Sequence, residues 1–362
     1  MLLAVTSSSF SQDDEEPFAV GGYASWLHSV MFDSINDIWV NNSILHNRVN
    51  LKAYFGSKFS AAVEVRNRLV LGDFVRLDPS YAASLSSDPG WADMSWNVFE
   101  GNSFVLNTMI DRAWIDFTSG NLQIRAGRQR INWSQALIWN PNDIFNTYSF
   151  FDFDYVERPG SDAVRIVLSP TPSSALEAAV KINSEKEFTA AVLYRFSLCN
   201  IDFQALAGEV DETDWVAGAG WSGAVGSYSV RGEATWFQPF DGNGIDDGTV
   251  IFTVGADKTF SDKFLALVQV MYCNQPLALG NFEDLYEGGL KASQLAFSTF
   301  TSMAQITYTP MPLVNISGSV IWYPDLKGFF AGPSLDYSLA ENVDFSFFWQ
   351  HSWSWLFLEP VV

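Results

Sequence analysis

Apolar and polar residues alternate along most of this chain, and the alternation restarts after each of many short turn signals. In one such stretch, Tyr228 and Trp236 fall on one face of an extended strand, whereas Arg231 and Glu233 fall on the other. A repeat of two residues is typical of a β-strand that has one apolar and one polar face. The whole pattern predicts seventeen such strands, and therefore an all-β fold.

The composition indicates what the apolar faces of these strands contact. Aromatic residues make up 15% of the chain and charged residues only 17%, although the net charge is −21. A soluble protein with so large a net charge normally covers its surface with charged side chains, but here Phe, Trp and Tyr take much of that share. We infer that the apolar faces contact lipid rather than water.

Membrane-spanning helices do not explain this contact with lipid. A helical span needs about 18 or more consecutive apolar residues, and the best candidate, residues 188–208, is interrupted by Arg195 and Asp202. The other structure that pairs every backbone group inside a bilayer is a closed barrel, whose alternating strands average near neutral hydropathy. The mean hydropathy of +0.05 agrees with this. We predict a transmembrane antiparallel up-and-down β-barrel of about 16 to 18 strands.

The connections between the predicted strands differ at the two ends of the barrel. One end has short turns, and the other has longer connections, such as residues 72–103 and 132–161. More than half of the 41 acidic residues lie at the long-loop end, whereas the short turns hold only Asp262 and Glu341. Long outer loops and short periplasmic turns are typical of bacterial outer-membrane barrels. The plain alternative is that loops are simply polar.

An acidic outer rim also predicts partners. Its carboxylates would meet the phosphates of lipopolysaccharide through bridging divalent cations, which prefer oxygen ligands. We therefore expect outer-membrane lipid and lipopolysaccharide to surround the protein. The apolar band that faces lipid would look the same in a subunit interface, so the pattern allows both a monomer and a homo-oligomer.

The two ends of the chain set the domain boundaries. Residues 1–11 combine a short apolar run with small residues at Ser9 and Ser11, and we interpret them as the remnant of an export signal peptide. Residues 12–362 then form a single barrel. An odd number of strands cannot return the chain to the periplasm, so either residues 351–362 supply an eighteenth strand or one predicted strand is false.

Arginine is concentrated between residues 48 and 165, and most of these arginines fall on the polar phase of their strands. A wall of cations inside the lumen would favour anionic or hydroxyl-rich solutes. The alternative is that the arginines pair with carboxylates in ladders that stiffen the barrel, and both can hold at once. The side chains that we expect to line the pore or its constriction are Arg48, Lys52, Glu64, Arg66, Arg68, Arg112, Asp116, Arg125, Arg128, Gln129, Trp133, Asp143, Arg158 and Arg165.

The connection formed by residues 132–161 is the most distinctive one. Its length and its many Trp, Phe, Tyr, Asn and Pro residues are unusual for a free extracellular loop. We expect it to fold into the lumen and narrow the pore, where aromatic rings could stack on sugars and polar side chains could bind hydroxyl groups. An inward segment of this kind serves equally well as a permanent plug.

Three short motifs lie in and around this connection: GRQRINW at residues 127–133, NPND at 140–143 and ERPGSDA at 157–163. Together they resemble a signature of uncharacterised Gram-negative outer-membrane porin-like barrels that are distantly similar to the alginate-export family, although Ser134 replaces a usual Gly. The resemblance implies membership of a porin-like group. Its matching positions are Arg128, Gln129, Trp133, Asp143 and Arg158. The many acidic residues argue against a polyanionic substrate.

Catalytic and nucleic-acid functions receive little support from the sequence. The chain has only three histidines, of which His28 and His351 each precede a serine. Neighbouring residues of a strand point to opposite faces, so these pairs cannot form a nucleophile and its base. No spacing of metal ligands and no phosphate loop occurs, and the acidic net charge disfavours nucleic acid. We predict a protein that is not an enzyme and needs no metal or cofactor.

The function that fits these features is a porin or channel of the bacterial outer membrane, for the passive passage of small hydrophilic solutes, with or without selectivity among them. The alternative is an outer-membrane barrel that does not transport, whose lumen is plugged and which acts as a scaffold or as part of a secretion complex.

Overall fold

A computed structural model describes residues 2–7, 17–32, 34–146, 160–242, 244–277 and 291–354 of the chain. Its strands are β1 (Leu2–Ser7), β2 (Phe18–Met31), β3 (Val40–Phe55), β4 (Phe59–Gly72), β5 (Ser95–Gly101), β6 (Phe104–Ser119), β7 (Leu122–Gln129), β8 (Ser161–Thr171), β9 (Ser174–Ile182), β10 (Phe188–Leu198), β11 (Ile201–Val210), β12 (Asp214–Val225), β13 (Tyr228–Pro239), β14 (Thr249–Thr259), β15 (Phe264–Cys273), β16 (Phe300–Met311), β17 (Val314–Tyr323), β18 (Gly328–Ala340), β19 (Val343–Phe348) and β20 (His351–Ser354).

Among the residues that the structure describes, helices are few and short. They are α1 (Asp73–Leu77), α2 (Tyr81–Ser86) and the 3-10 turns η1 (Ile245–Asp247) and η3 (Ala292–Gln294). Within the ranges given above, no helix has the length and apolar character that crossing a membrane requires.

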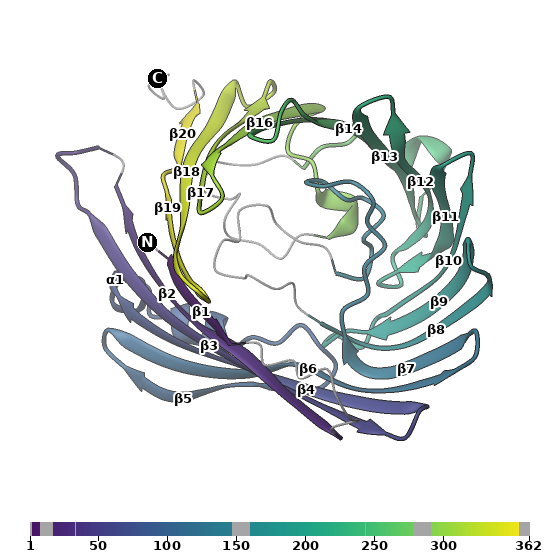
Figure 1. Ribbon diagram of the computed structural model, residues 1–362, viewed down its shortest axis with the longest axis horizontal. Helices are drawn as coiled ribbons and strands as arrows, with labels where there is room; N and C mark the ends of the chain where they lie inside the picture. Colours follow the sequence, from purple (N-terminus) through teal and green to yellow (C-terminus); the bar gives the residue numbers. More distant parts are fainter. Residues whose placement is uncertain are drawn as a thin grey trace.

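The strands are arranged around a central space (Figure 1). Neighbours along the chain pair antiparallel from β2 to β4 and from β6 to β19, and β4 pairs directly with β6. β1 pairs with both β19 and β2, and so connects the two ends of this sheet. The predicted antiparallel β-barrel is confirmed, and each of the seventeen predicted strands has a counterpart in the structure, although the strand predicted from residue 294 begins only at Phe300 (β16).

The ends of the barrel wall differ from the prediction. Residues His351–Ser354 pair with β18 just beyond the part that β19 covers, so they lengthen the β19 position and do not add an eighteenth strand. β2 and β19 run in the same direction, because both are antiparallel to β1. The short β5 was not predicted; it pairs with β6 beyond the point where β7 ends. Cleavage of residues 1–11 stays a prediction.

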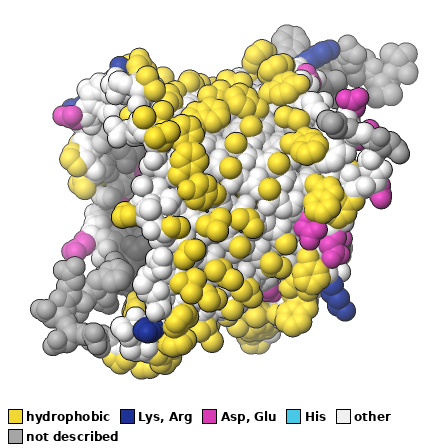
Figure 2. Space-filling model, turned by 90° about the vertical axis from the view of Figure 1, so that its right-hand side faces the viewer, with side chains coloured by type: hydrophobic (Ala, Val, Ile, Leu, Met, Phe, Trp, Pro, Cys, Tyr) yellow, Lys and Arg dark blue, Asp and Glu magenta, His cyan; other side chains and the backbone are white. Residues whose placement is uncertain are grey.

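Exposure alternates along the strands as the sequence predicted. In β3, Leu45 and Val49 are 48% and 37% exposed, whereas Ile44, His46 and Arg48 are 6%, 3% and 1% exposed. The exposed set points away from the lumen, and hydrophobic side chains cover most of the outer face that Figure 2 shows, with Asp and Glu gathered towards its margins. An apolar outer band of this kind suits the hydrocarbon region of a bilayer.

A β-bulge in β6 interrupts this alternation. Glu64 of β4 pairs with Arg112, but the next residue, Val65, pairs with Ile110, so Asp111 is the extra residue. A bulge shifts the side-chain phase of its strand by one residue. Both Asp111 and Arg112 therefore reach the lumenal side, where β4 presents Glu64.

Much of the apolar core lies inside the barrel. The larger buried cluster joins inward residues of β8–β18 to residues of two segments that lie within the ring, 131–145 and 292–297. A smaller cluster, formed by Leu27, Ile44, Val70 and Val105, packs against α1 and α2. Apolar side chains are therefore buried inside the barrel in two places, one along β8–β18 and one along β2–β6.

Candidate functional site

A ladder of ion pairs crosses the adjacent strands β3, β4 and β6. Arg48 Nη1 lies 2.5 Å from Asp111 Oδ2, and Arg48 Nη2 lies 2.5 Å from Glu64 Oε2. Arg66 Nε lies 3.4 Å from Asp111 Oδ1. Arg48, Arg66 and Asp111 are all almost fully buried. The two guanidinium groups are thus matched by carboxylates in the way that buried charges require.

The ladder continues on β6 and β7 with more accessible side chains. Arg112 Nε lies 3.7 Å from Glu64 Oε2, and Arg125 Nε lies 2.9 Å from Asp116 Oδ2. The Arg125 guanidinium also lies 4.0 Å above the ring of Trp114. These contacts agree with the interpretation of the arginines as a ladder of paired charges that stiffens the barrel. Arg112 and Arg125 are also partly exposed, as the other interpretation, a cationic wall that meets solutes, requires.

Two further predicted cations on this side have different contacts. Lys52 Nζ lies 4.8 Å from the centre of the Tyr54 ring, towards the short-turn end of β3. Arg68 Nη2 donates a hydrogen bond to the carbonyl oxygen of Leu85, at 3.3 Å, and so holds α2 against β4. Arg68 thereby connects the wall to the loop that follows β4.

Residues 131–146 run inside the ring of strands (Figure 1), and one carboxylate of β13 holds them there. Glu233 is 0% exposed. Its Oε1 accepts hydrogen bonds from the backbone N–H of Gln135 and, at 2.7 Å, of Ala136, and its Oε2 accepts one from Asn142 at 3.0 Å. A side chain from the wall therefore supplies the acceptor for three backbone donors of the inward segment.

Two glutamines of the same wall act in a similar way. Gln269 of β15 accepts from the backbone N–H of Ile138 and donates to the carbonyl oxygen of Trp139, both at 3.1 Å. Gln204 of β11 donates to the carbonyl oxygen of Trp133 at 2.7 Å. Both glutamines are almost fully buried, so the inward segment supplies part of the hydrogen bonding that buried amides require.

Glu177 of β9 joins the wall to the start of the inward segment. Its Oε1 accepts from Trp133 Nε1 at 2.5 Å and from Arg165 Nε at 2.6 Å. Arg165 Nη2 donates to Oε2 at 2.9 Å, and Arg195 Nη1 lies 3.8 Å from the same oxygen. Arg195 Nη2 also donates to the carbonyl oxygen of Asn132 at 3.1 Å.

Three residues predicted to line the pore are buried within the inward segment or at its root. Gln129 Nε2 donates to the carbonyl oxygen of Ala163 at 3.1 Å, and Asp143 Oδ1 accepts from the backbone N–H of Trp133 at 3.5 Å. With exposures of 2% or less, Gln129, Trp133 and Asp143 support the segment from within and do not face solvent. Arg158 lies outside the described residues.

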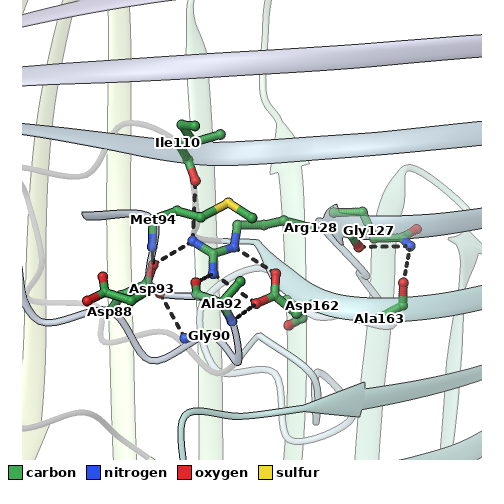
Figure 3. Close-up of polar contacts among 12 residues, drawn as sticks. Asp88, Gly90, Ala92, Asp93, Met94, Ile110, Gly127, Arg128, Asp162 and Ala163 are labelled. Atoms are coloured by element: carbon green, nitrogen blue, oxygen red, sulfur yellow. Dashed lines mark hydrogen bonds and ion pairs between the residues drawn. The ribbon is translucent and has the colours of Figure 1, made fainter. Parts of the chain in front are cut away.

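Arg128 differs from the other predicted arginines, because it contacts residues 88–92 of the loop before β5 as well as the strands on either side of it (Figure 3). Its Nε and Nη2 donate to Asp162 at 2.8 and 2.9 Å, and its Nη1 donates to Asp88 at 2.6 Å. The remaining donors reach the carbonyl oxygens of Ala92, at 2.6 Å, and Ile110, at 3.3 Å. All five N–H groups of the guanidinium therefore have an acceptor.

The sequence analysis missed several residues of this arrangement. Gln204, Gln269 and Arg195 fall on the polar phase of their strands, so their direction could have been found, but not their partners in the inward segment. Asp162 belongs to the ERPGSDA motif. Nothing in the sequence near Asp88 indicates its contact with Arg128, which lies forty residues later, in strand β7.

No known family model matches the chain, and no curated protein sequence is significantly similar to it. Solved structures are similar in fold. OccK5 (OpdH) of Pseudomonas aeruginosa matches with a TM-score of 0.58 at 7% identity, over 98% of this chain and 92% of that one. OccK2 (OpdF) of the same species, in complex with glucuronate, gives 0.54 at 7% identity, over 97% and 91%. Its outer membrane protein OprD gives 0.53 at 9% identity, over 97% and 87%. At such low identity the similarity establishes the fold: a transmembrane β-barrel of the kind found in outer-membrane proteins.

Proposed function

We propose that this protein is a porin or channel of a bacterial outer membrane, through which small hydrophilic solutes pass passively. One observation carries the proposal: Glu233 and Gln269 hold residues 131–146 against the wall, while a polar, arginine-rich wall lies across the barrel, on β4 and β6 (Figure 1). A narrowed lumen with polar groups on one side is how outer-membrane barrels combine passage with selection.

The side chains proposed to meet the solute are the partly exposed members of the ion-pair ladders. Arg125, Arg165 and Arg195 keep 23%, 20% and 35% of their side chains accessible, although each has a carboxylate nearby. A guanidinium that already has one carboxylate partner still presents further N–H donors to hydroxyl or carboxylate groups. The fully buried Arg48 and Arg66 instead stabilise the wall.

Two of the similar structures support the location and the class of solute. OprD is an outer membrane protein, and OccK2 was solved with glucuronate, a small hydrophilic anion. We carry both over to this chain as part of the proposal, together with surrounding outer-membrane lipid and lipopolysaccharide, assembly as a monomer or a homo-oligomer, and the absence of enzymatic activity. The finer resemblance to alginate-export-type barrels, based on the motifs at residues 127–133, 140–143 and 157–163, belongs to the same proposal.

Conductance across a planar bilayer tests the proposal. The purified protein should produce steady single channels, and liposomes that contain it should swell faster in small sugars than in large ones. Replacing Arg112 and Arg125 together by Gln should shift the reversal potential in a salt gradient towards cation selectivity. Arg76→Gln is the matched control, because Arg76 lies on α1 and is 63% exposed. A folded protein without steady channels would contradict the proposal.

A second candidate function has an observation of its own. The large apolar cluster inside the barrel packs residues 131–145 and 292–297 against β10–β18, as a permanent plug would. This favours a barrel that acts as a scaffold or as part of a secretion complex. A barrel that keeps its heat-modifiable migration on a denaturing gel but conducts no ions would support this second function.

A further inference from the structure

The contacts of Arg128 lie at both roots of the inward segment. Arg128 is the last residue but one of β7, and Asp162 is the second residue of β8. The inward segment begins just after the first strand, and the chain rejoins the wall at the second. The two residues are also direct partners in the β7–β8 pairing. Their ion pair, 2.8 Å from Arg128 Nε to Asp162 Oδ1, therefore ties the start of the segment to its end.

The two side chains lie in the lipid-facing phase of the wall. Arg128 is paired with Ala113 on one side and Asp162 on the other. Two residues away in the same phase are Ile115 and Val164, which are 62% and 48% exposed on the outer face. A charged pair in this phase would face lipid, which is costly in a transmembrane barrel. Both side chains are nevertheless buried, so something covers them.

The cover is the segment of residues 88–94, which we call the lid. Arg128 donates to Asp88 and to the carbonyl oxygen of Ala92, and Asp162 accepts from the backbone N–H of Ala92 at 3.0 Å (Figure 3). Asp88 fixes the lid's own shape, since it accepts from the backbone N–H of Met94 at 2.8 Å. The lid closes tightly: a Cβ added to Gly90 would lie 2.0 Å from Arg128 Nη2.

The far side of the lid is fastened to the wall by backbone contacts alone. Gly90 forms an isolated antiparallel bridge with Asn183, at the turn between β9 and β10. Ser184 donates its backbone N–H to the carbonyl oxygen of Pro89 at 3.0 Å. The lid thus begins at the turn between β9 and β10 and crosses the ends of β8 and β7. It ends beside β6, where Met94, the residue before β5, accepts the backbone N–H of Ile110.

We propose that Asp88, Arg128 and Asp162 are positioning residues for the inward segment, and that the lid of residues 88–94 sets the position of this segment through them. The lid covers a charge pair on the outer side of the wall, and the same pair fixes both roots of the segment on the inner side. Displacing the lid removes acceptors from a buried guanidinium and loosens both roots together. The proposal deepens the proposed channel function, since it assigns control of the narrowed lumen to a loop outside it.

A distance measurement tests the proposal without depending on conductance. Spin labels on Leu137→Cys, in the inward segment, and Ser227→Cys, in a short turn, report the segment's position in a Cys199→Ser background, because Cys199 is the exposed one of the two free cysteines. Asp88→Asn places an amide N–H against the donors of Arg128 and Met94. It should raise the population of loosened segments about tenfold or more and broaden the distance distribution.

Asp93→Asn is the matched control, since it makes the same charge change in the lid, but Asp93 Oδ1 accepts from the backbone N–H of Ser95, at 3.2 Å, and not from Arg128. It should leave the distribution unchanged. Gly90→Ala, which forces the lid away by its Cβ, should behave like Asp88→Asn. An unchanged distribution in both Asp88→Asn and Gly90→Ala would overturn the proposal, whether or not the protein conducts.

A reversible tether separates positioning from a general loss of stability. Pro89 and Ser184 lie opposite each other, so Pro89→Cys with Ser184→Cys can form a disulfide that fastens the lid to the wall. In the Asp88→Asn, Cys199→Ser protein, the loosened segment should raise the conductance above that of the original protein. Oxidation should then return the conductance to the original level, and reduction should raise it again.

The control tether, Ala205→Cys with Ala219→Cys, joins two paired wall strands away from the lid and should not restore the conductance. Equal rescue by both tethers would mean that the lid only adds stability, and would overturn the proposal. Absence of conductance in the unmodified protein would count against the channel function alone, because the distance measurement still decides the role of the lid.

Discussion

The two sides of the lumen satisfy their polar side chains in different ways. On β3, β4 and β6, charged side chains pair with one another across neighbouring strands, as Arg48 does with Glu64 and Asp111. On β11, β13 and β15, the buried polar side chains bond the backbone of the inward segment instead, as Glu233 and Gln269 do. The charges of the first side are paired within the wall, whereas the second side needs the segment for much of its hydrogen bonding.

The two sides therefore have different roles in positioning the inward segment. A wall of paired charges keeps its contacts wherever the inward segment lies, so it can serve as a fixed surface for solutes. A wall whose buried acceptors need the segment favours one position of that segment, since displacing it leaves polar groups buried without partners. The largest effects of single substitutions should therefore fall on the second side.

Glu233→Leu should have the largest effect. It removes the acceptor of three backbone N–H groups, those of Gln135, Ala136 and Asn142. Leaving several buried donors unpaired should lower the free energy of unfolding by about 3–6 kcal/mol. Urea unfolding in lipid vesicles measures the loss, and limited proteolysis should show cleavage between residues 131 and 146. A segment that stays resistant to protease would show that Glu233 does not hold it.

Asp111→Asn tests the side formed by β3, β4 and β6. It should lower the stability of the fold but leave the position of the inward segment unchanged. The change replaces the carboxylate that pairs with Arg48 and Arg66, two arginines that are almost fully buried. It should therefore lower the free energy of unfolding by about 3 kcal/mol. The inward segment should remain protease-resistant, because none of its described anchors involves Asp111. If Asp111→Asn exposes the segment as Glu233→Leu does, the two sides are not independent.

Gln269→Leu should give a smaller effect of the same kind as Glu233→Leu. It removes three neutral hydrogen bonds, two to the backbone of Ile138 and Trp139 and one to Thr253 Oγ1, and should lower the free energy of unfolding by about 1–3 kcal/mol. Gln305→Leu is a suitable control, since Gln305 lies on the next strand and donates only weakly to Thr307, at 3.4 Å. Equal losses in the two variants would remove Gln269 from the anchors of the segment.

The sequence predicts the first side of the lumen better than the second for a physical reason. Strand alternation is local, and hairpin neighbours such as Arg48 and Glu64 meet because consecutive strands pair. The bulge at Asp111 shifts the phase of β6, and one extra residue in a strand leaves no mark in the alternation that could be distinguished from an ordinary polar residue.

The second side depends on contacts between residues far apart in the chain. Glu233 bonds residues about a hundred positions earlier, and the alternation of β13 shows only that Glu233 faces the lumen. The lid is a stronger example, because Asp88 and Asp162 meet Arg128 only after β6, β7 and β8 have formed. The inward course of residues 131–146 could be expected from composition, but its anchors could not.

The smallest predicted effect concerns pH and the second segment inside the barrel. Asp325, in the turn between β17 and β18, accepts from the backbone N–H of Thr299 at 2.6 Å, and this hydrogen bond lowers the pKa of Asp325 below its ordinary value. A pKa lowered by folding means that the carboxylate stabilises the folded state above the unfolded pKa of about 3.9, and that this stabilisation is lost as the pH falls through the lower, folded pKa. Asp325→Asn should therefore be less stable than the original protein at neutral pH, and the difference in urea midpoint should shrink towards zero at the acidic end. The effect should be small because Asp325 is exposed to solvent. A difference that grows as the pH falls would show that Asp325 does not hold residues 292–299 through its charge.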